Sequence, residues 1–290
     1  MSGEVAALGC AFCWALSSTL MRGLTDQMPS VLLNALRSLV GTVLYALIIL
    51  GAGKVSLYSR ISVHDLAFVG INLAFGIVLG DTAYYSSMRL IGVSRALTIS
   101  SMYPLLVALL AGVALGEQLS VRTWLGFMLC IAGVILVARS SLQRGNPRPL
   151  RRIGRGVGLA VAAAFLWSIG TVALRIGSRN IDAFVVNSIR LGGVTLIAGI
   201  WAGTRGEMQR TRDLGRRQWL PLVLAAIVGS VAGATLYVTS VQLAGASKAA
   251  VLASTAPLFS VPMSLLDGET VNARLIAGIV VAVAGVMLVV

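Results

Sequence analysis

The sequence has few charged residues and almost none of the side chains that metal sites and most catalytic centres require. Only 11% of its 290 residues are charged, 10 are acidic, one is histidine and three are cysteine. Cys10, Cys13 and Cys130 lie in apolar segments, and His64 stands alone in a polar loop. Without a ligand cluster, a nucleophile–base pair or a phosphate-cradling loop, the sequence predicts no enzyme, no metal site and no cofactor.

Apolar residues dominate instead, at 57% of the chain with a mean hydropathy of +0.91. One water-soluble core cannot bury that share, but segments of about 20 apolar residues can cross a bilayer. The pattern predicts an all-α integral membrane protein with ten transmembrane helices. We expect them at 3–22, 30–50, 66–87, 93–114, 121–138, 156–175, 183–202, 219–241, 246–266 and 273–290.

The positive charge lies mainly in the loops between these segments. The net charge is +13, but no aromatic stacking platforms are interleaved with it, so we expect no nucleic-acid partner. Arginine-rich loops are typical of the cytoplasmic side of membrane proteins. Most Lys and Arg residues fall on the side opposite the termini, which predicts that both termini lie outside the cytoplasm.

The sequence repeats itself after a shift of about 153 positions. The matched pairs are Trp14/Trp167, Arg22/Arg175, Asn34/Asn187, Arg37/Arg190, Gly80/Gly233, Tyr84/Tyr237, Gly92/Gly245, Pro104/Pro257 and, after a one-residue slip, Gly116-Glu117/Gly268-Glu269. We therefore expect two five-helix repeats at 1–138 and 156–290, joined by an Arg-rich linker at 139–155. Because five is odd, the second repeat must enter the membrane in the opposite sense. Inverted repeats are typical of secondary transporters, which bind substrate near the midplane between the halves.

Polar side chains inside the predicted spans are the first candidate site residues, because each is costly in hydrocarbon. Arg37 and Arg190 occupy equivalent places, and Asn34 and Asn187 precede them by three residues on the same helix face. Two guanidiniums near the shared axis could hold a carboxylate or phosphate. Equally, each arginine could only tie its helix to neighbouring carbonyls or to an acid.

Asp81 breaks the repeat, because its equivalent is Ala234. A lone carboxylate inside a span could couple transport to a proton or another cation. It could also form an internal ion pair with Arg37 or Arg89, and the absence of a second carboxylate favours that interpretation.

Aromatic residues lie near these positions in both halves. Tyr84 and Tyr237, with Trp14 and Trp167 placed mid-span, could line a substrate cavity. A helix-packing role is as plausible for any one of them.

Two prolines fall mid-span in the fourth and ninth predicted helices. Pro104 and Pro257 each follow small polar residues that could satisfy the carbonyl a proline leaves free. Their symmetric placement makes them hinge candidates.

These motifs together resemble the EamA-type domain of the drug/metabolite transporter superfamily. The resemblance rests on residues 90–104 (LIGVSRALTISSMYP), Gly116-Glu117 and Gly126 to Gly133, which recur as 243–257 (LAGASKAAVLASTAP), Gly268-Glu269 and Gly278 to Gly285. It implies a secondary transporter in the bacterial inner membrane that exports or exchanges small metabolites such as amino acids. A proton or counter-substrate could drive it, and membrane lipid surrounds it.

The resemblance also implies cytoplasmic termini, against the loop charge. A non-transporting membrane receptor or assembly subunit on the same fold is the alternative function. Substrate, transport direction and oligomeric state are left open by the sequence.

Overall fold

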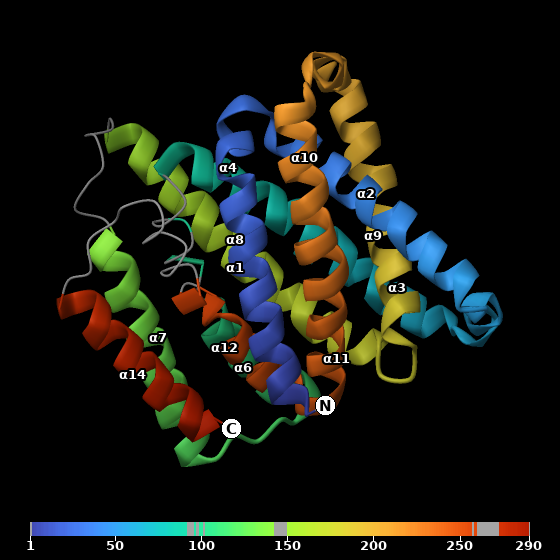
Figure 1. Ribbon diagram of the computed structural model, residues 1–290. Coiled ribbons are helices and arrows are strands. Elements are labelled where there is room, and N and C mark those ends of the chain that lie inside the picture. Colours follow the sequence, from blue (N-terminus) through green and yellow to red (C-terminus); the bar gives the residue numbers. More distant parts are fainter. Residues whose placement is uncertain are drawn as a thin grey trace.

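The protein is a bundle of helices, seen in the computed structural model in Figure 1. The structure describes residues 2–91, 96, 99–100, 102–141, 150–256, 258–259 and 273–289, and these are helical apart from short turns and loops. Both chain ends lie at the same end of the bundle in Figure 1. Pro257, Gly268-Glu269 and residues 142–149 of the predicted linker 139–155 lie outside the described residues.

The described helices follow the predicted order of apolar segments. Their bounds are α1 (Gly3–Gln27), α2 (Ser30–Gly51), η1 (Lys54–Arg60), α3 (Val63–Ile71), η2 (Asn72–Asp81), α4 (Thr82–Ile91), α6 (Tyr103–Leu115), α7 (Val121–Ser141), α8 (Leu150–Gly177), α9 (Ala183–Thr204), η4 (Glu207–Asp213), α10 (Arg216–Ala225), η5 (Ala226–Gly233), α11 (Ala234–Ala244), α12 (Ala246–Ala253) and α14 (Ala273–Val289).

Six stretches of the described chain are long and apolar enough to cross a membrane. They are Gly3–Met21, Ser30–Gly51, Val63–Ile91, Ile153–Gly177, Ala183–Thr204 and Arg216–Ala244. The predicted helices 66–87 and 219–241 are shorter than the two 29-residue stretches found there. Shorter apolar helices cover Tyr103–Leu115, Val121–Gly133 and Ile276–Leu288.

Local structure repeats with the same spacing as the sequence. Gly53 and Gly206 follow α2 and α9 with φ of 64° and 67°, a left-handed conformation that glycine adopts without steric cost. Each begins a 3₁₀ helix, η1 and η4, of seven residues. The two loops therefore have the same backbone design although their sequences differ.

The third span of each half contains a π-helical segment, η2 in one half and η5 in the other. Such segments are rare and often lie at functional sites. The first begins at Asn72 and ends at Asp81, so two polar residues of this span whose repeat equivalents are alanines lie at the two ends of the irregular stretch.

The two halves pack through reciprocal contacts. A side-chain carbon built on Gly80 would lie 2.7 Å from Trp167, and one on Gly233 would lie 3.0 Å from Trp14. These glycines leave room for the two indoles where α8 crosses η2 and α1 crosses η5. A second pair of contacts is related in the same way. Gly170 lies close to Gly76, and Gly229, the equivalent of Gly76, lies close to the serine of α1 that is equivalent to Gly170.

Two further helix pairs join equivalent elements of the halves. α2 packs on α9, and Thr42 and Thr195, which are equivalent in the repeat, share a hydrogen bond of 3.0 Å between their hydroxyls. α7 packs on α14 at the side of the bundle seen on the left in Figure 1. There Gly133 faces Ala282 and Gly285 faces Cys130, again as a reciprocal pair.

The predicted mid-helix position of Pro104 is wrong. α6 begins at Tyr103, so Pro104 lies in its first turn, where a missing N–H costs no helical hydrogen bond. Just before it, the Met102 N–H donates to the Ile99 carbonyl at 3.3 Å, a turn tighter than an α-helix. The second half repeats this bond at 3.2 Å between Thr255 and Leu252.

Asp182 precedes α9 and joins it to the loop after α2. Its carboxylate accepts from Lys54 Nζ at 2.6 Å and from the Phe184 N–H at 2.9 Å. Burial alone would raise the pKa of Asp182. The bonds from Lys54 and from the helix N–H groups outweigh burial and hold the pKa below its usual value. The ionised form therefore stabilises this end of the bundle.

We expect Asp182→Ala to lower the free energy of unfolding by about 1–2 kcal/mol at neutral pH, because it removes both a helix cap and an ion pair. A lowered pKa stabilises the fold above the unfolded pKa of about 4 and loses that effect as pH falls through the folded pKa. Unfolding curves in detergent from pH 7 to 3 should thus converge for wild type and variant. Asp182→Asn, which keeps a cap oxygen, should lose less, and curves that stay parallel would contradict the assignment.

Candidate functional site

Asp81 lies at the end of η2 and binds residues from two other helices. Its Oδ2 accepts from Arg37 Nη2 of α2 at 2.6 Å, and its Oδ1 accepts from Trp167 Nε1 of α8 at 2.9 Å. The Arg37 and Asp81 side chains keep 12% and 20% of their surface exposed. The arrangement is the ion pair that the sequence left as the alternative to a coupling site, and a bond from the opposite half completes it.

Arg190 of α9 is the repeat equivalent of Arg37, but it has no carboxylate partner among the described residues. Its Nε donates to Asn72 Oδ1 and its Nη1 donates to Asn187 Oδ1, both at 2.6 Å. Asn72 in turn donates to the Gly170 carbonyl at 2.7 Å, so three elements, η2, α8 and α9, meet here. Among the described residues, only the amide oxygens of Asn72 and Asn187 accept hydrogen bonds from this guanidinium, and the Arg190 residue is 6% exposed.

The asparagines of the two halves are used differently. Asn187 accepts from Arg190, whereas the fully buried Asn34 donates to the Ile77 carbonyl at 2.8 Å and to the Thr82 hydroxyl at 3.3 Å. Asn34 Oδ1 has no hydrogen-bond partner within the described part of the chain, and neither has Arg37 Nε. Asn34 therefore stabilises the end of η2, and Arg37 bonds to Asp81.

Aromatic rings form two groups around these polar residues. Trp167 lies 5.1 Å from Tyr84 and 5.9 Å from Tyr103, measured between ring centroids. Trp14 lies 4.9 Å from Tyr237, whose hydroxyl bonds to Thr171 at 2.8 Å. Each group joins both halves, and the Tyr84 hydroxyl is buried without a partner among the described residues.

The structure thus brings Arg37, Asp81 and Trp167 into direct contact at the end of η2. It places Arg190 and Asn187 at the start of the same segment, where Arg190 bonds to Asn72. Tyr84 joins the Trp167 group, and Trp14 and Tyr237 form the second ring pair. Pro104 stands apart from these bonds, at the start of α6. Sequence reasoning missed Asn72, although it is a polar residue inside an apolar span whose repeat equivalent, Ala225, cannot bond an arginine.

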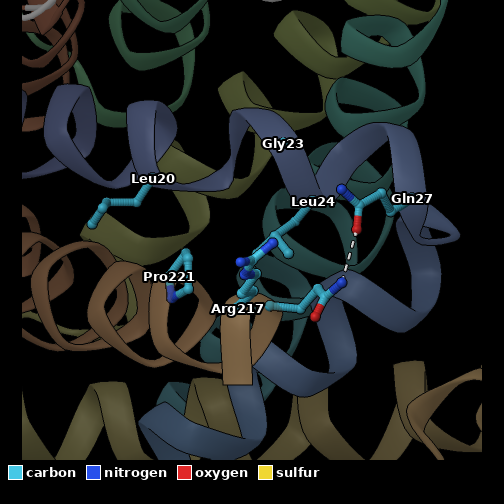
Figure 2. A pocket seen from close by; sticks show the side chains of 7 residues that line it. Leu20, Gly23, Leu24, Gln27, Arg217 and Pro221 are labelled. Atoms are coloured by element: carbon cyan, nitrogen blue, oxygen red, sulfur yellow. Dashed lines mark hydrogen bonds between the residues drawn. The ribbon is translucent and has the colours of Figure 1, made fainter. Parts of the chain in front are cut away.

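A hollow of about 310 Å³ lies elsewhere, between the end of α1 and the start of α10. Figure 2 shows Arg217 reaching across it toward Leu24, while Gln27 accepts a 3.3 Å hydrogen bond from Gln218 at its edge. None of the predicted site residues lines it. It lies at the end of the bundle opposite the termini, where α1 ends and α10 begins.

The described residues hold no group of three His, Cys, Asp or Glu side chains placed to bind a metal ion. Cys10, Cys13 and Cys130 are free thiols. The chemistry of the central site is therefore that of guanidinium, carboxylate, amide and aromatic groups.

Several long apolar helices around a small set of charged and aromatic side chains define a multi-pass membrane protein. The chain is similar to an uncharacterized transporter of Archaeoglobus fulgidus, 24% identical over 97% of this chain and 95% of the relative. It is also similar to the uncharacterized transporter YvbV of Bacillus subtilis, 25% identical over 95% of this chain and 87% of that one.

A solved crystal structure shares the fold with a TM-score of 0.74 and 21% identity, over 99% of this chain and 95% of that one. The model of the EamA-like transporter family matches residues 1–139 and again 154–290. The chain therefore belongs to the EamA-like transporter family, within the drug/metabolite transporter superfamily, and is a transporter of that type.

Proposed function

We propose that the protein is a secondary active transporter that moves a small metabolite by alternating access between two inverted five-helix repeats. The repeats are 1–138 and 156–290, with 139–155 as linker and ten membrane helices in all. It would export or exchange metabolites such as amino acids across the bacterial inner membrane. The observation that carries the proposal is the central charged cluster, which takes residues from both halves.

The reciprocal contacts support the inverted arrangement. When residue i of one half touches residue j of the other, the equivalent of j touches the equivalent of i, as a two-fold relation requires. Trp14 and Trp167 show this at Gly233 and Gly80, and Thr42 meets its own equivalent, Thr195. A five-helix unit related to its copy by a two-fold axis in the membrane plane has the opposite topology.

Two ties between the halves that use a carboxylate lie at the end of the bundle that holds the termini. Lys54 binds Asp182 at 2.6 Å, and Glu117 accepts from the Ser247 hydroxyl at 2.6 Å and from the N-terminus of α12. The hollow of Figure 2 lies at the opposite end. These observations support a conformation closed on one side, as alternating access requires. The tight turns before Pro104 and around Thr255 are the proposed hinges, with Pro257 as the partner of Pro104.

The test is flux into proteoliposomes that contain the purified protein, measured for a panel of labelled small metabolites under imposed proton and counter-substrate gradients. A transporter gives saturable, protein-dependent flux for at least one class. Substrate binding without flux under any gradient would favour the alternative, a receptor or assembly subunit on the same fold.

We expect Asp81→Asn to reduce proton-driven flux at least tenfold while the protein stays folded and binds substrate. The amide has one acceptor oxygen, so it keeps a hydrogen bond from Trp167 or from Arg37, but it cannot take up and release a proton. Flux measured against pH in both proteins is the readout. Unchanged flux with an unchanged pH profile would assign Asp81 a structural role.

A further inference from the structure

The central cluster carries one more positive than negative charge. It holds two guanidiniums, Arg37 and Arg190, and one carboxylate, Asp81, which binds Arg37 directly. Arg190 is held by the amides of Asn72 and Asn187, and its third nitrogen, Nη2, has no partner within the described residues. Because the equivalent of Asp81 is Ala234, the second half cannot neutralise its arginine as the first half does.

An uncompensated guanidinium inside a membrane protein is costly, and a neutral amide solvates it without cancelling its charge. A mobile anion can supply the missing charge. Tyr237 of α11 and Val186 of α9 lie in one apolar cluster, and Trp14 and Ile189 pack against it. The apolar surface next to Arg190 in α9 therefore includes the Trp14–Tyr237 ring pair.

We propose that Arg190 Nη2 binds the carboxylate of an organic anion whose apolar body rests on Trp14 and Tyr237. This inference rests on the proposed transport function and names the substrate class for it. The first half does not bind the anion, because Asp81 already occupies Arg37. Carboxylate and chloride share the anionic chemistry, and the experiment separates them.

The test uses Asn187→Asp, which supplies the missing carboxylate where the amide oxygen already lies 2.6 Å from Arg190 Nη1. Asn180→Asp, on an exposed loop, makes the same exchange and the same change in net charge. Thermal unfolding of the purified proteins is followed at pH 7 during titration with benzoate, with its neutral isostere benzamide, and with chloride. A ligand that binds only the folded state raises the unfolding temperature.

We expect benzoate, but not benzamide, to raise the unfolding temperature of the wild type and of Asn180→Asp. Asn187→Asp should bind benzoate about tenfold to a hundredfold more weakly, because the new carboxylate neutralises Arg190. The variant should be at least as stable as the wild type, because a charged acceptor replaces the neutral amide oxygen. Arg190→Lys, which loses the planar fork, gives a second variant with the same expected loss of benzoate binding.

Equal responses to benzoate and benzamide, a benzoate response that survives both Arg190-site variants, or no benzoate response at all would overturn the proposal. A chloride response without a benzoate response would also overturn it. Saturable flux of a neutral metabolite that is unchanged in Asn187→Asp would support the transport function and contradict the anion site. Absence of flux for every metabolite would instead reject the transport function.

Discussion

Asp81→Ala is expected to lower the free energy of unfolding by about 3 kcal/mol or more, because it leaves Arg37 charged inside the bundle without its acid. Arg37 has little else to rely on. Its Nε lacks a partner among the described residues. The guanidinium also makes a cation–π contact with the Tyr85 ring, whose centroid lies 5.7 Å from the guanidinium carbon. Trp167 Nε1 loses its acceptor in the same step. Chemical unfolding in detergent, followed by tryptophan fluorescence, measures the loss.

The matched control removes both charges. In Arg37→Met/Asp81→Leu, apolar side chains of similar size replace the pair, and such replacements are often neutral or stabilising. We expect the double variant to recover most of the stability that Asp81→Ala loses. If Asp81→Ala unfolds like the wild type, or if the double variant is the least stable of the three, the pair does not stabilise the fold.

The apolar segments were predictable because bilayer thickness fixes the length of a spanning helix. α2 and α9 begin and end within a few residues of the predicted 30–50 and 183–202. The π-helical stretches η2 and η5 were not predictable in this way. A π and an α segment differ in the register of backbone hydrogen bonds, and the hydrophobic pattern of a fully apolar span does not record that register.

For the candidate site, the sequence likewise predicted the charged residues but not their bonding partners. A costly charge inside a span identifies itself by composition, so Arg37, Arg190 and Asp81 stand out in the sequence. Partner choice depends on how α8 packs on η2, and no local pattern encodes that contact. Asn72 shows the limit, because its bond to Arg190 follows from the crossing of two halves. The repeat still contained a signal for Asn72, because Asn72 and Asp81 both align with an alanine of the second half after the shift.

Ala234→Asp tests whether the halves are structurally equivalent at this site. Ala234 occupies the place of Asp81, and Gly233 contacts Trp14 Nε1 at 3.1 Å where Gly80 contacts Trp167 Nε1 at 2.9 Å, measured from a built side-chain carbon. A carboxylate at 234 should thus accept from the Trp14 indole and pair with Arg190. In the Asp81→Ala background, Arg37 can then turn to Asn34 Oδ1, which has no partner in the described residues of the wild type.

We expect Ala234→Asp to raise the free energy of unfolding of Asp81→Ala by about 1.5 kcal/mol or more, since it returns the cluster to its original net charge and satisfies a second indole. Unfolding of the single and double variants in detergent measures the gain. Ala234→Asn is the control, because it has the same shape without the charge and should recover much less. A new carboxylate that finds no partner inside the bundle would destabilise either background by several kcal/mol. That result would mean that Arg190 and Trp14 are not arranged around position 234 as Arg37 and Trp167 are arranged around Asp81.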